Sequence, residues 1–166
     1  MIRPATFNDI STILEITRAC AAHLCSQGIF QWNENYPSRA AFENDQKNRE
    51  LHVLEIDAEI IGAIAISTKK DAIYEPIQWL TPDATNGYLH RLCVHPLYQG
   101  KGHASALLDF AEQSLKSAGA ISVRLDTFSK NIKNNRLYES RGYKKLGDVY
   151  FEQKSPYPFH CYEKLL

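Results

Sequence analysis

Two periods of hydrophobic residues alternate along the chain, and they predict alternating helices and strands. Apolar and small residues recur every three or four positions over 10–24 and 104–115, as on the buried face of an amphipathic helix. Shorter, denser runs of branched side chains are typical of buried strands. In chain order, we predict a strand at 2–5, helices at 10–28 and 38–48, a hairpin of strands at 51–56 and 60–67, a strand at 88–94, a helix that follows Gly102 and stops at Gly119, a strand at 121–126, a helix at 131–141 and strands at 143–151 and 159–165.

This order of elements predicts an α/β fold in one domain that spans residues 1–166. Strands that alternate with helices in the second half require right-handed crossovers, which produce a mixed sheet with helices on both faces. The chain has 166 residues and is 44% hydrophobic, so it can form a core without disulfides or a structural metal. The segment 74–79 and the loop 81–83 give no clear pattern.

The charge of the chain argues against a strongly basic nucleic-acid-binding protein. Nineteen Lys and Arg residues balance 19 Asp and Glu residues. The distribution is uneven, because residues 1–98 hold 8 basic and 12 acidic side chains, whereas residues 99–166 hold 11 and 7. We therefore expect no nucleic-acid partner, and we expect an anionic ligand to prefer the second half.

The N-terminal segment and the cysteines predict a soluble, cytoplasmic protein that binds neither a membrane nor a metal. The longest apolar stretch is only 60–66, too short for a signal peptide or a membrane span. The four cysteines lie in predicted helices and strands, so we expect reduced thiols. Cys20-x-x-His23-x-Cys25 offers at most three ligands on one helix, and Cys20 falls on the apolar face of that helix.

One turn between a predicted strand and a predicted helix has the features of an anion site. Unpaired backbone N–H groups and the helix dipole favour an anion at Gln99–Ala104. Gly100 and Gly102 allow a phosphate to approach the backbone, and Lys101 adds a positive charge. A Walker A loop is disfavoured because Lys101 is followed by glycine, and a Rossmann fingerprint because Ser105 stands at the third glycine position.

Two stretches of the chain match known sequence motifs. Gln99, Gly102 and Ala104 match the signature Q/R-x-x-G-x-G/A. Asn131 and the stretch 137–143 resemble the block N-x-x-A-x-x-L-Y-x-x-x-G-F. With these two motifs the chain resembles the GNAT (Gcn5-related) N-acetyltransferase superfamily. The resemblance covers essentially the whole chain. It implies the GNAT fold, a central, mostly antiparallel sheet with one parallel strand pair and helices on both faces.

The resemblance also implies that the chain binds acetyl-CoA. Asn134 replaces the usual alanine and His103 the usual apolar or aromatic residue, but the glycines and Asn131 are retained, so we expect binding to survive. The backbone at 92–94 is expected to pair with the pantetheine amides and to meet the developing oxyanion. The implied cofactor-binding residues are Leu92, Cys93, Val94, Gln99, Gly100, Lys101, Gly102, His103, Ala104, Ser105, Asn131 and Tyr138.

The family reaction is direct transfer of an acetyl group to an amine, which needs a base and an acid. A primary amine with a pKa of about 10 is only about one part in a thousand neutral at pH 7, so a group must accept its proton. His90 is the first candidate, acting through a water, because arylalkylamine-type members have a histidine at this strand position. Asp126 and a bound water alone stay open. Tyr138 matches the usual general acid, which protonates the leaving thiolate.

The resemblance leaves the acceptor unspecified beyond a primary amine of a small molecule or peptide, and the acidic first half favours a cationic one. A non-catalytic acyl-CoA-binding or regulatory module on the same fold is the alternative, against which Tyr138 argues. Edge strands near the C-terminus favour a homodimer. Aromatic residues are candidates for the acceptor pocket, with core packing equally open for each: Trp32, Tyr36, Tyr74, Trp79 and Tyr88.

Overall fold

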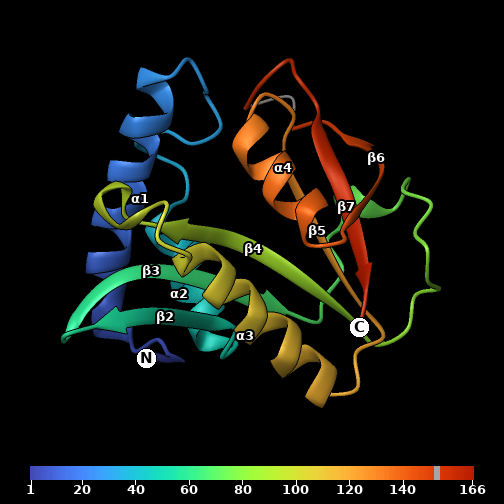
Figure 1. The fold of residues 1–166 in the computed structure, drawn as a ribbon, viewed down its shortest axis with the longest axis horizontal. Coiled ribbons are helices and arrows are strands. Elements are labelled where there is room, and N and C mark those ends of the chain that lie inside the picture. The colour runs from blue at the N-terminus through green and yellow to red at the C-terminus, as the bar shows by residue number, and fades with distance from the viewer. Residues whose placement is uncertain (152–153) are drawn as a thin grey trace. The chain divides into compact units, whose positions relative to one another are not determined.

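The helices and strands follow one another in the order that the hydrophobic pattern predicts (Figure 1). The structure is a computed structural model that describes residues 1–151 and 154–166. The elements are β1 (Ile2–Pro4), α1 (Ile10–Ser26), α2 (Arg39–Lys47), β2 (Leu51–Ile56), β3 (Glu59–Ser67), β4 (Asn86–Val94), α3 (His103–Ser117), β5 (Ser122–Phe128), α4 (Ile132–Ser140), β6 (Lys144–Val149) and β7 (Phe159–Leu165).

Three strand ends differ from the prediction by two residues because pairing partners, not apolar runs, set them, while the other strand ends differ by at most one residue. β4 starts two residues early, at Asn86, which pairs with Ser122 of β5. β5 continues two residues further than predicted, to Phe128, which pairs with Phe159 of β7. β6 ends at Val149, its last residue in register with β7.

The strands of the described residues form one sheet in the order β1-β2-β3-β4-β5-β7-β6. The pairs β1/β2, β2/β3, β5/β7 and β6/β7 are antiparallel. β4 and β5 are parallel, in register from Asn86/Ser122 to Tyr88/Arg124. The mixed, mostly antiparallel sheet with one parallel pair is therefore confirmed.

The chain forms two compact units, each built from two stretches of sequence. The first unit comprises residues 1–66 and 90–111, and the second comprises residues 67–89 and 112–166. β4 and α3 each contribute residues to both. That the whole chain behaves as one domain stays a prediction.

In the first unit, α1 and α2 bury their apolar residues against one face of the strands. Ile10 and Ile13 of α1 and Phe42 of α2 are fully buried in a cluster with Val53 of β2 and Ala63 of β3. Figure 1 draws α1 in dark blue beside these strands. This cluster is the hydrophobic core of the unit.

The start of α3 covers the opposite face of the same strands. Side chains alternate between the two faces of a strand, so neighbours of the core residues point to the other side. The ring of His52 in β2 lies 5.2 Å from the ring of Phe110 in α3. A Cβ atom on Gly62 of β3 would lie 3.4 Å from Leu107 of α3. Helices on both faces were predicted, and the first unit has them.

In the second unit, α4 and the end of α3 pack on β5 and its neighbours. The ring of Tyr138 in α4 lies 6.0 Å from that of Tyr162 in β7. A Cβ atom at Gly87 of β4 would come within 2.2 Å of Leu115 in α3, so only glycine permits this close approach.

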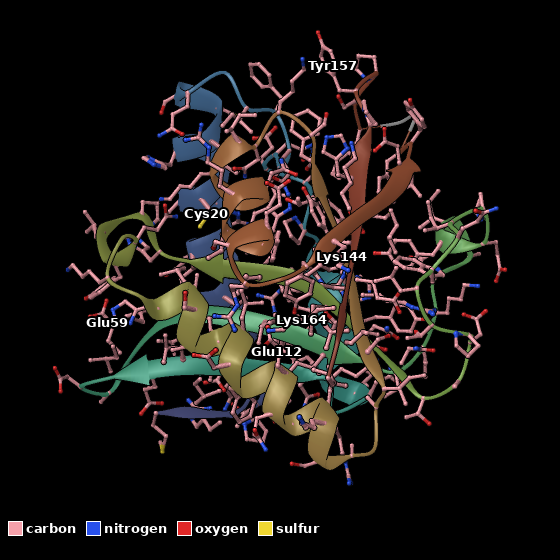
Figure 2. The ribbon with its side chains drawn as sticks, turned by 45° about the vertical axis from the view of Figure 1, so that its right-hand side comes forward. Cys20, Glu59, Glu112, Lys144, Tyr157 and Lys164 are labelled. Atoms are coloured by element: carbon pink, nitrogen blue, oxygen red, sulfur yellow. The ribbon has the colours of Figure 1, made fainter. Side chains whose placement is uncertain are left out.

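A carboxylate on α3 joins three elements of the second unit. Glu112 accepts a hydrogen bond of 2.6 Å from the Lys164 ammonium in β7, and the two side chains meet in Figure 2. Arg141 and Tyr143, which follow α4, donate to the same carboxylate at 3.1 and 3.0 Å. Glu112 therefore ties the end of α3 to β7 and to the end of α4.

The helices of the described residues include none with the length and apolar character needed to cross a membrane.

Candidate active site

The turn after β4 is fixed by the side chain of Gln99. The Gln99 amide donates a hydrogen bond of 2.9 Å to the carbonyl oxygen of Val94, the last residue of β4. The Cys20 thiol of α1 donates to the same carbonyl at 3.2 Å. A short 3₁₀ turn, Pro96–Tyr98, lies between Val94 and Gln99 in the sequence. The first residue of the motif thus closes the loop that leads to α3.

Both glycines of the motif have left-handed backbone conformations. The φ angle is 77° at Gly100 and 84° at Gly102, values that cost other residues roughly 1–2 kcal/mol. A Cβ atom at either position would meet nothing within 4 Å. Backbone conformation, and not a close protein neighbour, is therefore the reason for glycine here.

The helix that follows presents its N-terminal N–H groups. The Ala106 N–H donates to the Gly102 carbonyl at 3.0 Å. In an α-helix the first N–H groups have no intrahelical acceptor, so those around His103, Ala104 and Ser105 remain for another acceptor. These three residues are half-buried, while Gly100 and Gly102 are exposed. The open glycine turn and the positive end of the helix dipole fit a phosphate group.

Lys101 extends along the same loop. Its ammonium lies 5.3 Å from the centre of the Tyr98 ring, a cation–π contact. The Tyr98 hydroxyl donates to Glu59 of β3 at 2.6 Å, and Glu59 is labelled in Figure 2. The predicted positive charge therefore lies on the loop and remains exposed.

The residues of β4 that were expected to bind the cofactor through their backbone differ in exposure. Leu92 is half-buried, whereas Cys93 and Val94 are buried. Burial raises the pKa of the Cys93 thiol far above its usual value, so this side chain stays neutral. His90, the candidate base, is half-buried in the same strand. Its catalytic role stays a prediction.

Arg91, between His90 and Leu92, has a conformation unusual for a residue with a side chain. Its φ angle is 53° within a strand. Its guanidinium forms two hydrogen bonds with Asp45 of α2, Nε to Oδ2 at 2.6 Å and Nη2 to Oδ1 at 2.7 Å. This pair was not predicted from the sequence. Two features of the sequence could have indicated the pair. Arg91 is a charged residue inside an apolar strand, and Asp45 is an acidic residue three positions after the apolar Phe42 on a helix.

The second unit contains the candidate acid, Tyr138, on the buried side of α4. Only 6% of the residue is exposed, and its ring lies 5.7 Å from Tyr143 in an edge-to-face contact. Burial and then the nearby charge of Asp126 raise the pKa of Tyr138 above its usual value. The hydroxyl therefore keeps its proton at neutral pH.

Asp126 is a half-buried carboxylate that interacts with several groups of the second unit. It accepts a hydrogen bond from the Tyr74 hydroxyl. Burial and then the Asp126 charge raise the pKa of both Tyr74 and Cys161, its register partner in β7. The environment around Asp126 thus favours neutral or cationic groups. Its possible role as the base stays open.

Asn131 begins α4. Its side-chain oxygen accepts a hydrogen bond of 3.1 Å from the Asn134 N–H, so Asn131 is the N-cap of the helix. Because the backbone N–H of residue 134 makes this bond, the replacement of the family alanine by Asn134 does not disturb it. Asn131 is buried, and its expected contact with the cofactor stays a prediction.

The aromatic residues proposed for the acceptor pocket lie in different surroundings. Trp32 packs on the core of the first unit, and Tyr36 contacts Arg91. In the second unit, the Arg124 guanidinium lies 4.6 Å from the Trp79 ring and 5.8 Å from the Tyr88 ring. Trp79 and Tyr88 thus have a packing role, Tyr74 is buried, and the acceptor role of all five residues stays a prediction.

The described residues contain no group of three His, Cys, Asp or Glu side chains arranged to hold a metal ion. Cys20 is buried on α1, while His23 is exposed. All four cysteines are free thiols.

Comparisons with known proteins agree with the motifs. The model of the Acetyltransferase (GNAT) family matches residues 14–143. A search of curated proteins found no match. Among solved structures, a GNAT-family acetyltransferase from Streptococcus agalactiae 2603 has a TM-score of 0.84 and 22% identity over 100% of this chain and 95% of its own.

Two further similar structures contain a cofactor. The yncA protein from Salmonella typhimurium, solved with its cofactor acetyl-CoA, has a TM-score of 0.71 and 20% identity over 100% of this chain and 93% of its own. The paia N-acetyltransferase from Thermoplasma acidophilum, in complex with coenzyme A, has a TM-score of 0.73 and 22% identity over 100% of this chain and 98% of its own. These similarities establish the fold, and the family match extends over more than half of the sequence. The chain therefore belongs to the GNAT family of acetyltransferases.

Proposed function

We propose that this protein is an N-acetyltransferase that moves the acetyl group of acetyl-CoA to a primary amine of a small molecule or a peptide. One observation carries the proposal. Gly100 and Gly102 have left-handed φ angles in an open turn that leads directly into α3, which is the backbone geometry that a pyrophosphate needs. The similar structures solved with acetyl-CoA and coenzyme A support this assignment.

Acetyl-CoA would be held by backbone groups more than by side chains. The N–H groups from Gly100 to Ser105 would bind the pyrophosphate, and Lys101 would add charge. The backbone of Leu92–Val94 would pair with the amides of the pantetheine arm. The bound cofactor supplies a thioester, which contains both the acetyl group and a thiol leaving group.

Tyr138 would donate a proton or a hydrogen bond to the leaving sulfur. A phenol is a stronger acid than an alcohol, and a raised pKa keeps this phenol protonated at every physiological pH. His90 would take the proton of the amine through a water, with Asp126 as the other side chain that remains open. A negative charge at Asp126 would also favour a cationic acceptor.

We propose that the protein is cytoplasmic, because free thiols such as its four cysteines are typical of proteins in a reducing compartment.

The proposal is tested first by thermal unfolding with CoA, acetyl-CoA, ATP and NAD in parallel. A ligand at 100 times its dissociation constant adds about 2.7 kcal/mol of stability, so a rise in Tm with CoA and acetyl-CoA alone is expected. Release of free thiol is then followed with acetyl-CoA and a panel of amines, including diamines and peptides. A response to ATP or NAD instead would overturn the cofactor assignment.

The same experiment separates the enzyme from a non-catalytic acyl-CoA-binding module. Both bind CoA, but only the enzyme releases thiol in an amine-dependent manner. Binding without turnover for every amine in the panel would favour the module.

A further inference from the structure

The ion pair between Arg91 and Asp45 joins β4 to α2 within the first unit. Asp45 is 2% exposed, and its two carboxylate oxygens each accept one hydrogen bond from the Arg91 guanidinium. This two-point contact fixes the plane of the guanidinium as well as its position. Tyr36, in the segment between α1 and α2, also contacts Arg91 through its side chain. Arg91 is therefore held by two elements outside its own strand.

The contact between Arg91 and Asp45 matters because the backbone of Arg91 has an unfavourable conformation. A φ angle of 53° inside a strand is disfavoured for any residue with a Cβ atom and is free for glycine. Among the described residues, the other left-handed positions are five glycines and three turn residues, Arg49, Asp57 and Ala58, so Arg91 is the one that lies inside a strand. A strained conformation persists where its surroundings enforce it, and the Asp45 contact is such a constraint.

The conformation of Arg91 sets the direction of the residues on either side of it. A left-handed residue interrupts the regular alternation of side chains along a strand. The φ angle of Arg91 therefore determines the directions of the His90 side chain and of the Leu92 N–H group. His90 is the candidate base, and the backbone from Leu92 is the candidate partner of the thioester.

We propose that Asp45 and Arg91 are positioning residues for acetyl transfer, with the ion pair holding the irregular backbone of β4 that aligns His90 and Leu92. The inference rests on the proposed function, because it needs those two groups to act on the reaction. The pair does not touch the substrate. It acts through the backbone of the strand.

Three variants test this role. In Asp45→Asn the guanidinium loses its charged partner, and we expect kcat to fall by about 10- to 100-fold, because a displacement of about 1 Å at a reacting group costs that much. The dissociation constant of CoA, measured by calorimetry, should change far less, since the glycine turn is intact. In the double variant Asp45→Asn with Arg91→Gly, glycine adopts the left-handed conformation without a partner, so kcat should recover most of the loss.

Asp9→Asn is the matched control. Asp9 forms a two-point contact with Arg3 in the same unit, at 2.8 and 3.3 Å, and belongs to no part of the proposed site. This variant should lower Tm and leave kcat unchanged. If Asp45→Asn lowers kcat no more than Asp9→Asn, or if the added Arg91→Gly lowers kcat further, the positioning role is wrong.

A backbone measurement keeps this inference separate from the proposed function. Backbone chemical shifts of residues 90–92 report their φ angles directly by NMR. We expect Asp45→Asn to move the shifts of Arg91 away from left-handed values, the double variant to keep left-handed values at this position and Asp9→Asn to leave them unchanged. If the wild-type protein binds no CoA and acetylates nothing, the proposed function fails and the positioning role falls with it. Unchanged shifts in Asp45→Asn overturn the inference alone.

Discussion

The Arg124 guanidinium and the Glu163 carboxylate meet at 3.0 Å with no exposure of either side chain to solvent. The two residues are register partners on β5 and β7. Glu163 also accepts hydrogen bonds of 2.6 Å from Ser122 and 2.5 Å from Thr81. Arg124 donates to the Thr81 backbone at 2.7 Å. The pair therefore anchors the loop at Thr81 to the middle of the sheet in the second unit.

Arg124→Met should destabilise the second unit strongly. The substitution leaves the Glu163 carboxylate buried without its cation, which typically costs about 3–5 kcal/mol. Urea denaturation measures the free energy of unfolding. Lys70→Met is the control, because its partners Asp83 and Glu75 are 59% and 70% exposed and pairs with exposed groups contribute little to stability. An Arg124→Met cost no larger than that of Lys70→Met would contradict this account.

Removing both charges should cost less than removing one. In Arg124→Met with Glu163→Leu, no charge is left buried without a partner, so part of the lost stability should return. Equal or greater destabilisation of the double variant would show that packing, and not the unpaired charge, determines the cost.

Stability should decline in acid because the pKa values of Asp9 and Glu163 are lowered in the folded protein. The Arg3 guanidinium lowers the pKa of Asp9 below its usual 3.8. Burial alone would raise the pKa of Glu163, but hydrogen bonds from Ser122, Thr81 and Arg124 outweigh burial and lower it below 4.5. A lowered folded-state pKa contributes stability above the usual value, and this contribution is lost as pH falls through the folded-state pKa.

We therefore expect the contribution of Asp9 and Glu163 to the free energy of unfolding to be steady near neutral pH and to fall below about pH 4.5. Burial lowers the pKa of His52 from 6.5 and adds a separate decline that begins below pH 6.5, whereas burial raises the pKa of Asp45 and acts in the opposite sense. Denaturation curves at a series of pH values check this. In Asp9→Asn the acid-induced decline should be smaller than in the wild-type protein. An identical pH dependence of the two proteins would mean that Asp9 does not contribute.

Tyr138→Phe should lower turnover far more than it weakens CoA binding. Loss of a general acid or donor costs on the order of 100-fold or more in kcat. Thiol release gives kcat, and calorimetry gives the dissociation constant of CoA. Tyr143→Phe is the control, because Tyr143 packs on Tyr138 but its hydroxyl donates to Glu112. Equal losses of kcat in the two variants would argue for packing and against acid catalysis.

The raised pKa of Tyr138 also predicts the alkaline side of the rate profile. Because burial and Asp126 hold the proton on this phenol, kcat should show no decline from its ionisation up to about pH 10. A loss of kcat between neutral pH and pH 10 that disappears in Tyr138→Phe would contradict this prediction.

The glycine turn and the order of elements were predictable because both depend on local sequence. Gly100 and Gly102 mark left-handed positions that other residues avoid, and apolar periodicity identifies helices and strands without knowledge of their partners. The GNAT fold was implied by the resemblance of two local motifs to that family, and it is confirmed.

Long-range contacts explain what the sequence did not reveal. The segment 68–85 has little apolar pattern, because polar contacts such as those of Arg124 and Glu163, more than 35 residues away, hold its end in place. The left-handed conformation of Arg91 likewise has no local signal, since its partner Asp45 lies on a distant helix. A charged residue inside an apolar strand signals that a partner exists, but only the fold identifies that partner.

The central claim is that the glycine turn before α3 binds coenzyme A, and calorimetric titration of Gly102→Ala with CoA tests it most directly. Alanine at a φ of 84° costs roughly 1–2 kcal/mol or displaces the turn. Gly119→Ala is the matched control, because Gly119 has a φ of 83° with equally open space after the other end of the same helix. We predict that both variants lose stability and that only Gly102→Ala loses affinity for CoA. Equal CoA affinity in Gly102→Ala, Gly119→Ala and the wild-type protein would contradict the claim.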